Sequence, residues 1–125
     1  MAKVKSKYNN KKIEKYGRKW DSKMELDYYE YLLELKKAGD VIDIELQPVF
    51  LLQDKFKYMN KTIRKIEYKA DFKVTYSNGS VEVIDVKGMV LNDFKLKLKL
   101  ARCKYRDTVF KCIRKYKGEW VDLGI

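Results

Sequence analysis

Residues 62–76 alternate between apolar and polar side chains, and this pattern constrains the fold more than any other feature of the sequence. Side chains of a β-strand point alternately to opposite faces, so the pattern predicts one long strand with a buried and a solvent-facing side. The next residues, Ser77-Asn78-Gly79-Ser80, contain the Asn-Gly signal of a hairpin turn, which predicts a returning strand over residues 81–87. The buried side would hold Ile66, Tyr68, Ala70, Phe72, Val74 and Tyr76, and the other side Lys65, Glu67, Lys69, Asp71, Lys73 and Thr75.

Helical periodicity is found before and after this hairpin. Ser22 and Glu25 have the spacing of a capping box, which predicts a helix over residues 21–37 that Gly39 ends. Residues 93–105 predict a second helix. Its apolar line is Phe94, Leu98 and Ala101, and a parallel basic line is Lys95, Lys99 and Arg102.

The remaining segments complete one α/β domain over residues 21–125. Residues 41–52 are predicted to form a strand that Pro48 bends or places at a sheet edge. Residues 54–60 predict a turn, residues 108–113 a last strand, and the region near Trp120 a short one. The order helix, three strands, helix, strand predicts a central mixed sheet flanked by helices.

The charge of the chain predicts a polyanionic partner. Lys and Arg number 29 against 18 Asp and Glu, giving a net charge of +11. No apolar run approaches the roughly 20 residues that span a bilayer, and the basic helix line leaves no large apolar face for a membrane surface, so nucleic acid is favoured. Residues 1–20 are expected to be a flexible basic segment that contacts DNA, with a short strand near 12–16. A solubilising terminus is the alternative.

Absent residue types exclude several chemistries. The chain has no histidine, which excludes Ser-His-Asp and Cys-His catalysis and His-metal nucleases. Its two cysteines, Cys103 and Cys112, are too few for a four-ligand zinc site and are expected to be buried reduced thiols. With no signal peptide, a cytoplasmic location is expected.

Asp85-Val86-Lys87 is the motif that carries chemistry. Asp85 and Lys87 would project from the same strand face, and Asp71 lies on the partner strand. Two carboxylates can hold a hard cation through oxygen, and the lysine can orient or deprotonate a water or neutralise charge on a phosphate. In a chain that is 38% charged, a surface ion pair is the alternative interpretation.

These motifs resemble the PD-(D/E)xK nuclease superfamily. Ala70-Asp71 followed by Asp85-Val86-Lys87 matches its signature, with Ala70 in place of the proline. Leu46-Gln47-Pro48 and Asp85-Val86-Lys87-Gly88 are similar to small phage-encoded nucleases of the superfamily, and the spacing of the acids and the lysine is similar to Holliday junction resolvases. The resemblance covers residues 20–113 and implies a restriction-endonuclease-like core.

The resemblance also implies roles for single residues. Asp71, Asp85 and the Val86 carbonyl would bind Mg²⁺, for which Mn²⁺ would substitute, and Lys87 would sit beside the attacking water. Glu25 matches an acid that the family often places on its first helix, and its role in a capping box is an equally good explanation. Gln47 could contact the scissile phosphate or be an ordinary strand residue, and Glu45 is a weaker candidate ligand.

The sequence thus predicts a Mg²⁺-dependent structure-selective endodeoxyribonuclease, most simply a homodimeric Holliday junction resolvase of phage origin that acts on four-way DNA junctions. No base-reading module is recognisable, and no small-molecule cofactor is expected. Another phage DNA endonuclease, directed at mismatches, nicks or flaps, and a non-catalytic DNA-binding module are the alternatives. The predicted DNA contacts, all but one of them basic, are Lys11, Lys12, Lys15, Arg18, Lys19, Gln47, Lys69, Lys73, Lys95, Lys99 and Arg102.

Overall fold

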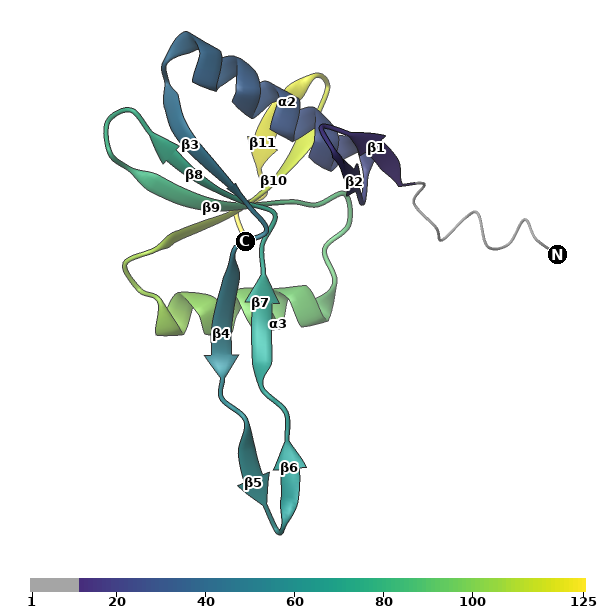
Figure 1. Cartoon of the computed structure of the whole chain (residues 1–125), viewed down its shortest axis with the longest axis vertical. Helices are drawn as coiled ribbons and strands as arrows, with labels where there is room; N and C mark the ends of the chain where they lie inside the picture. The colour runs from purple at the N-terminus through teal and green to yellow at the C-terminus, as the bar shows by residue number, and fades with distance from the viewer. Residues whose placement is uncertain (1–11) are drawn as a thin grey trace, which may run out of the picture.

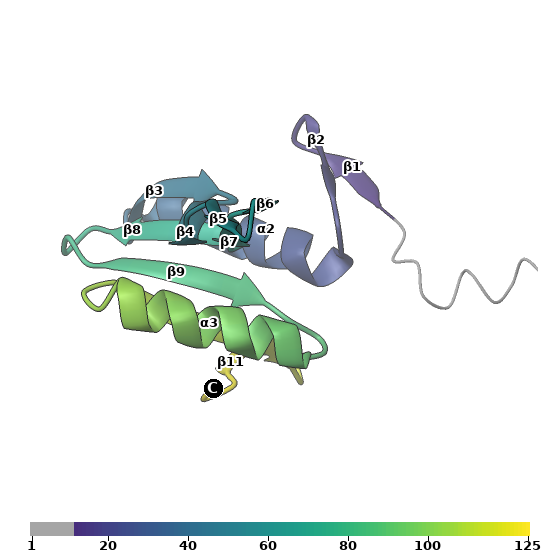
Figure 2. The ribbon, with the colours of Figure 1, turned by 90° about the horizontal axis from the view of Figure 1, so that it is seen from below.

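The computed structural model describes residues 12–125 and has a five-stranded mixed sheet with one helix on each face (Figures 1 and 2). The strand order across the sheet is β11-β10-β9-β8-β3. β3, β8 and β9 are antiparallel neighbours, β10 runs parallel to β9, and β11 is antiparallel to β10. Their bounds are Val41–Leu46 for β3, Phe72–Tyr76 for β8, Val81–Val86 for β9, Val109–Tyr116 for β10 and Glu119–Asp122 for β11. The predicted α/β class with a mixed sheet flanked by helices is confirmed.

Both predicted helices are present. α2 spans Lys23–Ala38, begins at the N-cap Ser22 and ends at Gly39, whose φ of 92° is the left-handed conformation that glycine adopts without strain. α3 spans Asn92–Lys104. Along the chain, the helices and the strands of the main sheet follow the predicted order α2, β3, β8, β9, α3, β10. β11 is the short strand predicted near Trp120.

The two helices cover two separate hydrophobic cores. Under α2, the core is built around the fully buried Trp20, Leu32 and Phe72. Under α3, the second core contains Tyr68, Ala70, Val83, Leu98, Ala101 and Phe110. Val83 and Ile84 are consecutive in β9 and enter different cores, which shows that β9 is buried on both faces.

The prediction of one long strand over residues 62–76 is wrong. The segment is divided into β6 (Lys61–Ile63), β7 (Ile66–Lys69) and β8, with a bend at Ala70 and Asp71. Tyr68 and Ala70 enter the α3 core, whereas Phe72 enters the α2 core although it has the same parity. The backbone therefore turns over at the bend, and the alternating pattern persists because both faces find an apolar core.

The predicted strand over 41–52 is interrupted in the same way. It consists of β3 and β4 (Val49–Gln53), separated by Gln47, whose φ of 52° is in the left-handed region, and by the buried Pro48. Two hydrogen bonds join the two interruptions, from Gln47 N–H to the Asp71 carbonyl at 2.9 Å and from Ala70 N–H to the Pro48 carbonyl at 3.0 Å. The two segments that follow β3 and precede β8 thus leave the sheet together, as the antiparallel ribbon β4–β7.

The ribbon continues into a second hairpin that extends past α3 (Figure 1). β5 (Phe56–Tyr58) pairs with β6, where a turn was predicted over 54–60, and the turn itself is confined to Met59 and Asn60. Both turn residues have positive φ, which matches the right-handed twist of the flanking strands.

The folded region begins before residue 21. The strand predicted near 12–16 is present as β1 (Ile13–Lys15), and it pairs with β2 (Arg18–Trp20), which the sequence did not predict. Because Trp20 is fully buried in the α2 core, the β1–β2 hairpin packs against the rest of the domain. Residues 1–11 of the predicted basic segment, including Lys11, lie outside the described residues.

Two smaller observations concern the cysteines and membranes. Both cysteines are free thiols; Cys112 is buried as predicted, whereas Cys103 is exposed on α3, so the prediction that it is buried is wrong. Within residues 12–125, neither helix has the length and apolar composition needed to cross a membrane.

Candidate functional site

Asp71 and Asp85 come together where β8 begins and β9 ends. The β8–β9 ladder pairs Phe72 with Ile84, so Asp71 is placed opposite Asp85, one residue beyond that pair. The Asp71 Oδ2 atom accepts a hydrogen bond from the Val86 main-chain N–H at 2.8 Å, and the main-chain N–H of Asp71 interacts with the Asp85 carboxylate. The strand register and the hydrogen bond to Asp71 Oδ2 hold both acids at one end of the sheet.

Glu25 brings a third carboxylate to this end of the sheet from the first turn of α2. Its main-chain N–H donates to Ser22 Oγ at 3.1 Å, as a capping box requires. Its carboxylate is next to Asp71 instead, and its Oε2 atom is buried without a hydrogen-bond partner among the described residues. Of the two predicted roles for Glu25, this position agrees with the one in which it faces the other acids.

Burial raises the pKa of all three carboxyl groups, because the charged form loses its hydration. The pKa of Glu25 is raised to about 7, with the adjacent Asp71 as the second cause. The pKa of Asp85 is also raised to about 7, although Lys87 and the Asp71 N–H favour its charged form. The pKa of Asp71 is raised as well, against the opposing effects of the Val86 N–H and Lys87. The positive charge around the three acids is therefore too small to offset the effect of their burial.

This donor set fits a hard divalent cation. Glu25 Oε2 and Asp85 Oδ2 are both buried and have no hydrogen-bond partner among residues 12–125, which is unfavourable for a carboxylate. Within residues 12–125, no three carboxylates or thiols are already arranged around one point as ligands. Mg²⁺ commonly takes only one or two protein carboxylates and completes its shell with water and substrate phosphate, so Asp71 and Asp85 are sufficient as its protein carboxylates.

Lys87 follows β9 directly and lies between these acids and an open cavity. Its positive charge lowers the pKa of both Asp71 and Asp85, and its Nζ is 4.6 Å from the centre of the Phe94 ring. The cavity has a volume of about 530 Å³ and lies between the β4–β7 ribbon and the start of α3. Its lining consists of Val49, Glu67, Tyr68, Lys69, Lys87, Asp93, Phe94 and Lys97.

The basic residues of α3 are distributed differently from the prediction. Lys97 lines the cavity beside Lys87, and the sequence analysis missed it. The predicted line of Lys95, Lys99 and Arg102 instead borders a separate cavity of about 390 Å³ together with Ile125. Arg102 donates a 2.6 Å hydrogen bond to the Phe110 carbonyl. Helical spacing identified which residues share a line, but it could not show which flank of the helix faces the acids.

The basic residues of the β1–β2 hairpin have partners within the domain. Lys12 forms a salt bridge with Asp21 at 3.1 Å, and Lys15 forms one with Glu30 at 2.6 Å. Arg18 lies close enough to Glu25 to lower its pKa, which places it near the acids, and Lys19 is exposed. Asp21, which the sequence analysis did not select, raises the pKa of both Glu25 and Asp71.

The remaining predicted contacts lie on the strands beside the acids. Gln47 contributes through its backbone, which donates to the Asp71 carbonyl. Lys69 lines the cavity beside Lys87. Lys73 is half-buried in β8 and pairs in register with Glu45 of the edge strand β3.

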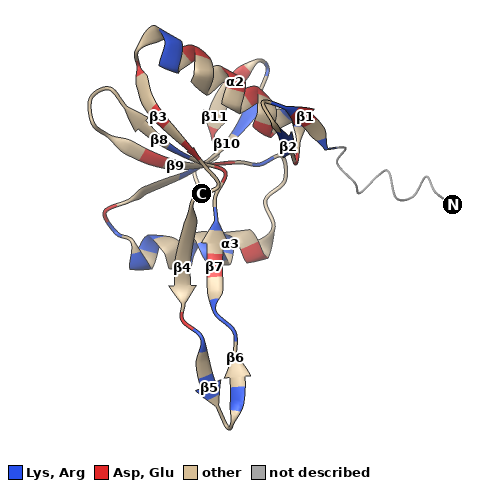
Figure 3. Ribbon diagram, viewed as in Figure 1, with Lys and Arg blue, Asp and Glu red and all other residues tan. Residues whose placement is uncertain are grey.

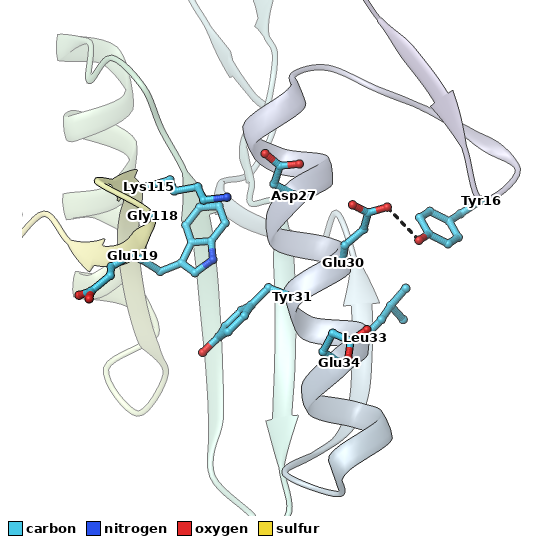
Figure 4. A pocket seen from close by; sticks show the side chains of 10 residues that line it. Tyr16, Asp27, Glu30, Tyr31, Leu33, Glu34, Lys115, Gly118 and Glu119 are labelled. Atoms are coloured by element: carbon cyan, nitrogen blue, oxygen red, sulfur yellow. Dashed lines mark hydrogen bonds between the residues drawn. The ribbon is translucent and has the colours of Figure 1, made fainter.

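A larger cavity, of about 840 Å³, lies apart from these residues, between the β1–β2 turn, α2 and the β10–β11 turn (Figure 4). Four of its lining residues are acidic and one is basic: Asp27, Glu30, Glu34, Glu119 and Lys115. In Figure 4 the Glu30 carboxylate accepts a hydrogen bond from the Tyr16 hydroxyl, at 3.0 Å. Two of the four acids form salt bridges, Glu30 with Lys15 at 2.6 Å and Asp27 with Lys23 at 3.0 Å.

Comparison with known proteins gives one match. The sequence model of a family described as "Protein of unknown function (DUF1064)" matches residues 5–118. No curated protein and no solved structure matches the chain.

Proposed function

We propose that this chain, which belongs to the DUF1064 family, is a Mg²⁺-dependent endodeoxyribonuclease with a restriction-endonuclease-like core. The observation that carries the proposal is the pair of buried, unpartnered carboxylate oxygens on Glu25 and Asp85, beside Asp71 and Lys87. Folding alone gives no reason to retain such groups, because apolar residues of similar size would be more favourable at these positions. Clusters of buried acids with raised pKa values are typical of functional sites.

The topology supports the same conclusion. The helix α2, the antiparallel strands β3, β8 and β9, the helix α3 and the parallel strand β10 follow one another in the order that the PD-(D/E)xK resemblance implies. The acids lie at the ends of β8 and β9, and Lys87 is two residues after Asp85.

Each residue of the site has a role in this proposal. Asp71, Asp85 and the Val86 carbonyl would hold Mg²⁺, or Mn²⁺ in its place, and Glu25, beside Asp71, would contribute to the metal site or engage a second ion. The ion would supply the positive charge that polarises a phosphodiester and favours ionisation of an attacking water. Lys87 orients that water or neutralises charge on the phosphate. Lys69 and Lys97, which line the cavity beside Lys87, hold the flanking phosphates.

The substrate in this proposal is branched DNA, with the four-way junction first. The basic contacts near the site address phosphates, which carry no sequence information. Symmetric resolution of a junction needs two active sites, so a two-fold homodimer is part of the proposal. Flaps, nicks and mismatches are the alternative targets, and a non-catalytic DNA-binding role is the alternative to enzymatic activity.

The test is DNA cleavage by the wild type and by Asp85→Asn. We expect the wild type to cut labelled four-way junctions in Mg²⁺ or Mn²⁺ but not in EDTA, and Asp85→Asn to be reduced to background. Asp43→Asn, which changes an exposed acid on β3, is the matched control and should cut like the wild type. Absence of cleavage in every metal, or undiminished cleavage by Asp85→Asn, would overturn the proposal.

The same assay distinguishes the substrates. Paired, symmetric nicks confined to the junction centre support resolution. Equal cutting of linear duplex, or preferential cutting of flaps or mismatches, would replace the four-way junction with one of the alternative substrates.

A further inference from the structure

The β5–β6 hairpin is an uncovered extension of the domain. Every residue from 53 to 66 is exposed, and the hairpin extends beyond α3 (Figure 1). Tyr58 is 60% exposed and Met59 79% exposed at its tip. A two-stranded hairpin gains little stability by itself in water. The β5–β6 hairpin therefore contributes little to the stability of the fold, and contact with a partner explains its exposed position better.

The two sides of the hairpin differ in character. The register pairs Phe56 with Ile63 and Tyr58 with Lys61, which puts these four side chains on one face. Lys57 and its partner Thr62 occupy the opposite face. One face therefore carries two aromatic residues with Ile63 and Lys61, and the other carries Lys57 and Thr62; no element of the described chain covers either face.

The charge of this segment is strongly positive (Figure 3). Residues 54–65 contain one acid, Asp54, and five basic residues, which are Lys55, Lys57, Lys61, Arg64 and Lys65. Among residues 12–125, Lys65 is the only one of these five in a salt bridge, with Glu67 at 3.0 Å. Lysines on an exposed strand also discourage edge-to-edge aggregation, but that function does not explain an exposed tyrosine and methionine at the tip.

We propose that the β5–β6 hairpin inserts into a groove of duplex DNA next to the phosphodiester held at Lys87. The inference rests on the proposed function, because it takes the bound polyanion to be DNA. The major groove of B-DNA, about 12 Å wide, admits a two-stranded β-ribbon. Lys57 and Lys61 contact phosphates on the groove walls, and Tyr58 and Met59 contact the base edges.

The position of the hairpin relative to the site favours this partner. The β4–β7 ribbon connects the hairpin to the acids, and Lys69 at the end of β7 lines the cavity that contains Lys87. One duplex can therefore meet the hairpin and the site together. A second copy of the chain is less favoured, because pairing two such tips would bring like charges into contact.

The experiment measures DNA binding in the Asp85→Asn background, where no cleavage is expected, by fluorescence anisotropy over a range of NaCl concentrations. We expect Lys57→Glu/Lys61→Glu to weaken binding of a junction or a duplex by about tenfold or more. The slope of log affinity against log salt should fall by about 2, since two phosphate contacts are lost. Tyr58→Ala should weaken binding without changing that slope. The control is Lys36→Glu/Lys37→Glu, which makes the same charge change in the last turn of α2, outside the hairpin.

The outcomes separate this inference from the proposed function. If the wild type cuts DNA and the hairpin variants bind as well as the Lys36→Glu/Lys37→Glu control, the inference is wrong and the nuclease proposal stands. If no cleavage is found but the hairpin variants bind DNA weakly, the hairpin is a DNA-binding element on a non-catalytic protein. If sedimentation shows that the variants are monomers of a dimeric wild type with unchanged DNA affinity, the hairpin is a dimer contact and the inference is overturned.

Discussion

At the scale of single residues, the site is built from groups whose charges oppose folding. Asp85 is 1% exposed, and its Oδ2 atom has no hydrogen-bond partner in the described part of the chain. Glu25 is 4% exposed and has an unpartnered oxygen of its own. Both are tolerated because their pKa values rise to about 7, so each can fold as a neutral acid below that pH.

The raised pKa values predict an unusual dependence of stability on pH. Unfolded Asp and Glu titrate near about pH 4, so between about pH 4 and 7 the folded metal-free protein binds more protons than the unfolded chain. The stabilising contribution of Glu25 and Asp85 is therefore complete below about pH 4 and is lost as the pH rises through about 7. At pH 8, Asp85→Asn should raise the Tm of the metal-free protein by about 4 °C or more, and at pH 5 by much less. Thermal unfolding in EDTA measures this, and an Asp85→Asn protein that is less stable than the wild type at pH 8 would contradict it.

Lys87 and Lys69 should affect different steps although they line the same cavity. Lys87 lies beside the acids, so Lys87→Met should lower the single-turnover cleavage rate at saturating DNA by about 100-fold or more, with little change in DNA affinity. Lys69→Met should weaken DNA binding and leave the saturated rate within a few-fold of wild type. A Lys87→Met protein that lost affinity but kept its rate would assign Lys87 to phosphate binding.

At the scale of secondary-structure elements, the paired interruptions of the strands create the site. The bend at Ala70 and Asp71 takes β7 out of the sheet and leaves Asp71 free to accept the Val86 N–H. Gln47 makes the matching turn in the neighbouring strand with a positive φ and donates to the Asp71 carbonyl.

Two substitutions of Gln47 test this coupling, because both remove the side chain and only one suits the backbone. A β-branched residue is strained at a φ of 52°, so Gln47→Val should destabilise the protein by about 1–3 kcal/mol. It should also reduce cleavage by displacing Asp71. Gln47→Gly should retain both stability and cleavage. Urea unfolding and the cleavage assay check these expectations; a loss of cleavage in Gln47→Gly would show instead that the Gln47 side chain itself contacts substrate.

The sequence predicted the elements better than their geometry. Ser22 and Gly39 gave the bounds of α2 to within about two residues, because capping depends on local backbone chemistry. The Asn78-Gly79 turn was found for the same reason, and Gly79 has the positive φ of 90° that it requires. The turnover at Ala70 and Asp71 was not predictable from the alternation, since buried residues on either face give the same pattern.

The site was predicted in part for related reasons. Asp71, Asp85 and Lys87 follow from the register of one hairpin, which the sequence specifies. The positions of Lys97 and Arg18 near the acids could not be predicted, because they depend on how α3 and the β1–β2 hairpin pack against the sheet. That packing is set by contacts between residues distant in the sequence.

At the scale of the whole molecule, the net charge of +11 is unevenly distributed. The 840 Å³ cavity beside α2 is lined by four acids, two of which form salt bridges with lysines. Residues 54–65, which include the β5–β6 hairpin, contain five basic residues and one acid. In the proposed function, this asymmetry would orient a DNA duplex across the end of the sheet where Asp71 and Asp85 lie. The acids at the ends of β8 and β9 and those of the 840 Å³ cavity are the two positions at which a divalent cation would be sought.

The location of the bound cation is therefore the most direct test of the account. We would titrate ¹⁵N-labelled protein with Mn²⁺ and follow the paramagnetic broadening of assigned backbone amide resonances. We expect the amides of Glu25, Asp71, Val86 and Lys87 to broaden first, and Asp85→Asn to abolish this broadening. Broadening that begins at Glu30, Glu34 and Glu119, with the β8–β9 edge unaffected, would contradict the assignment of the metal centre.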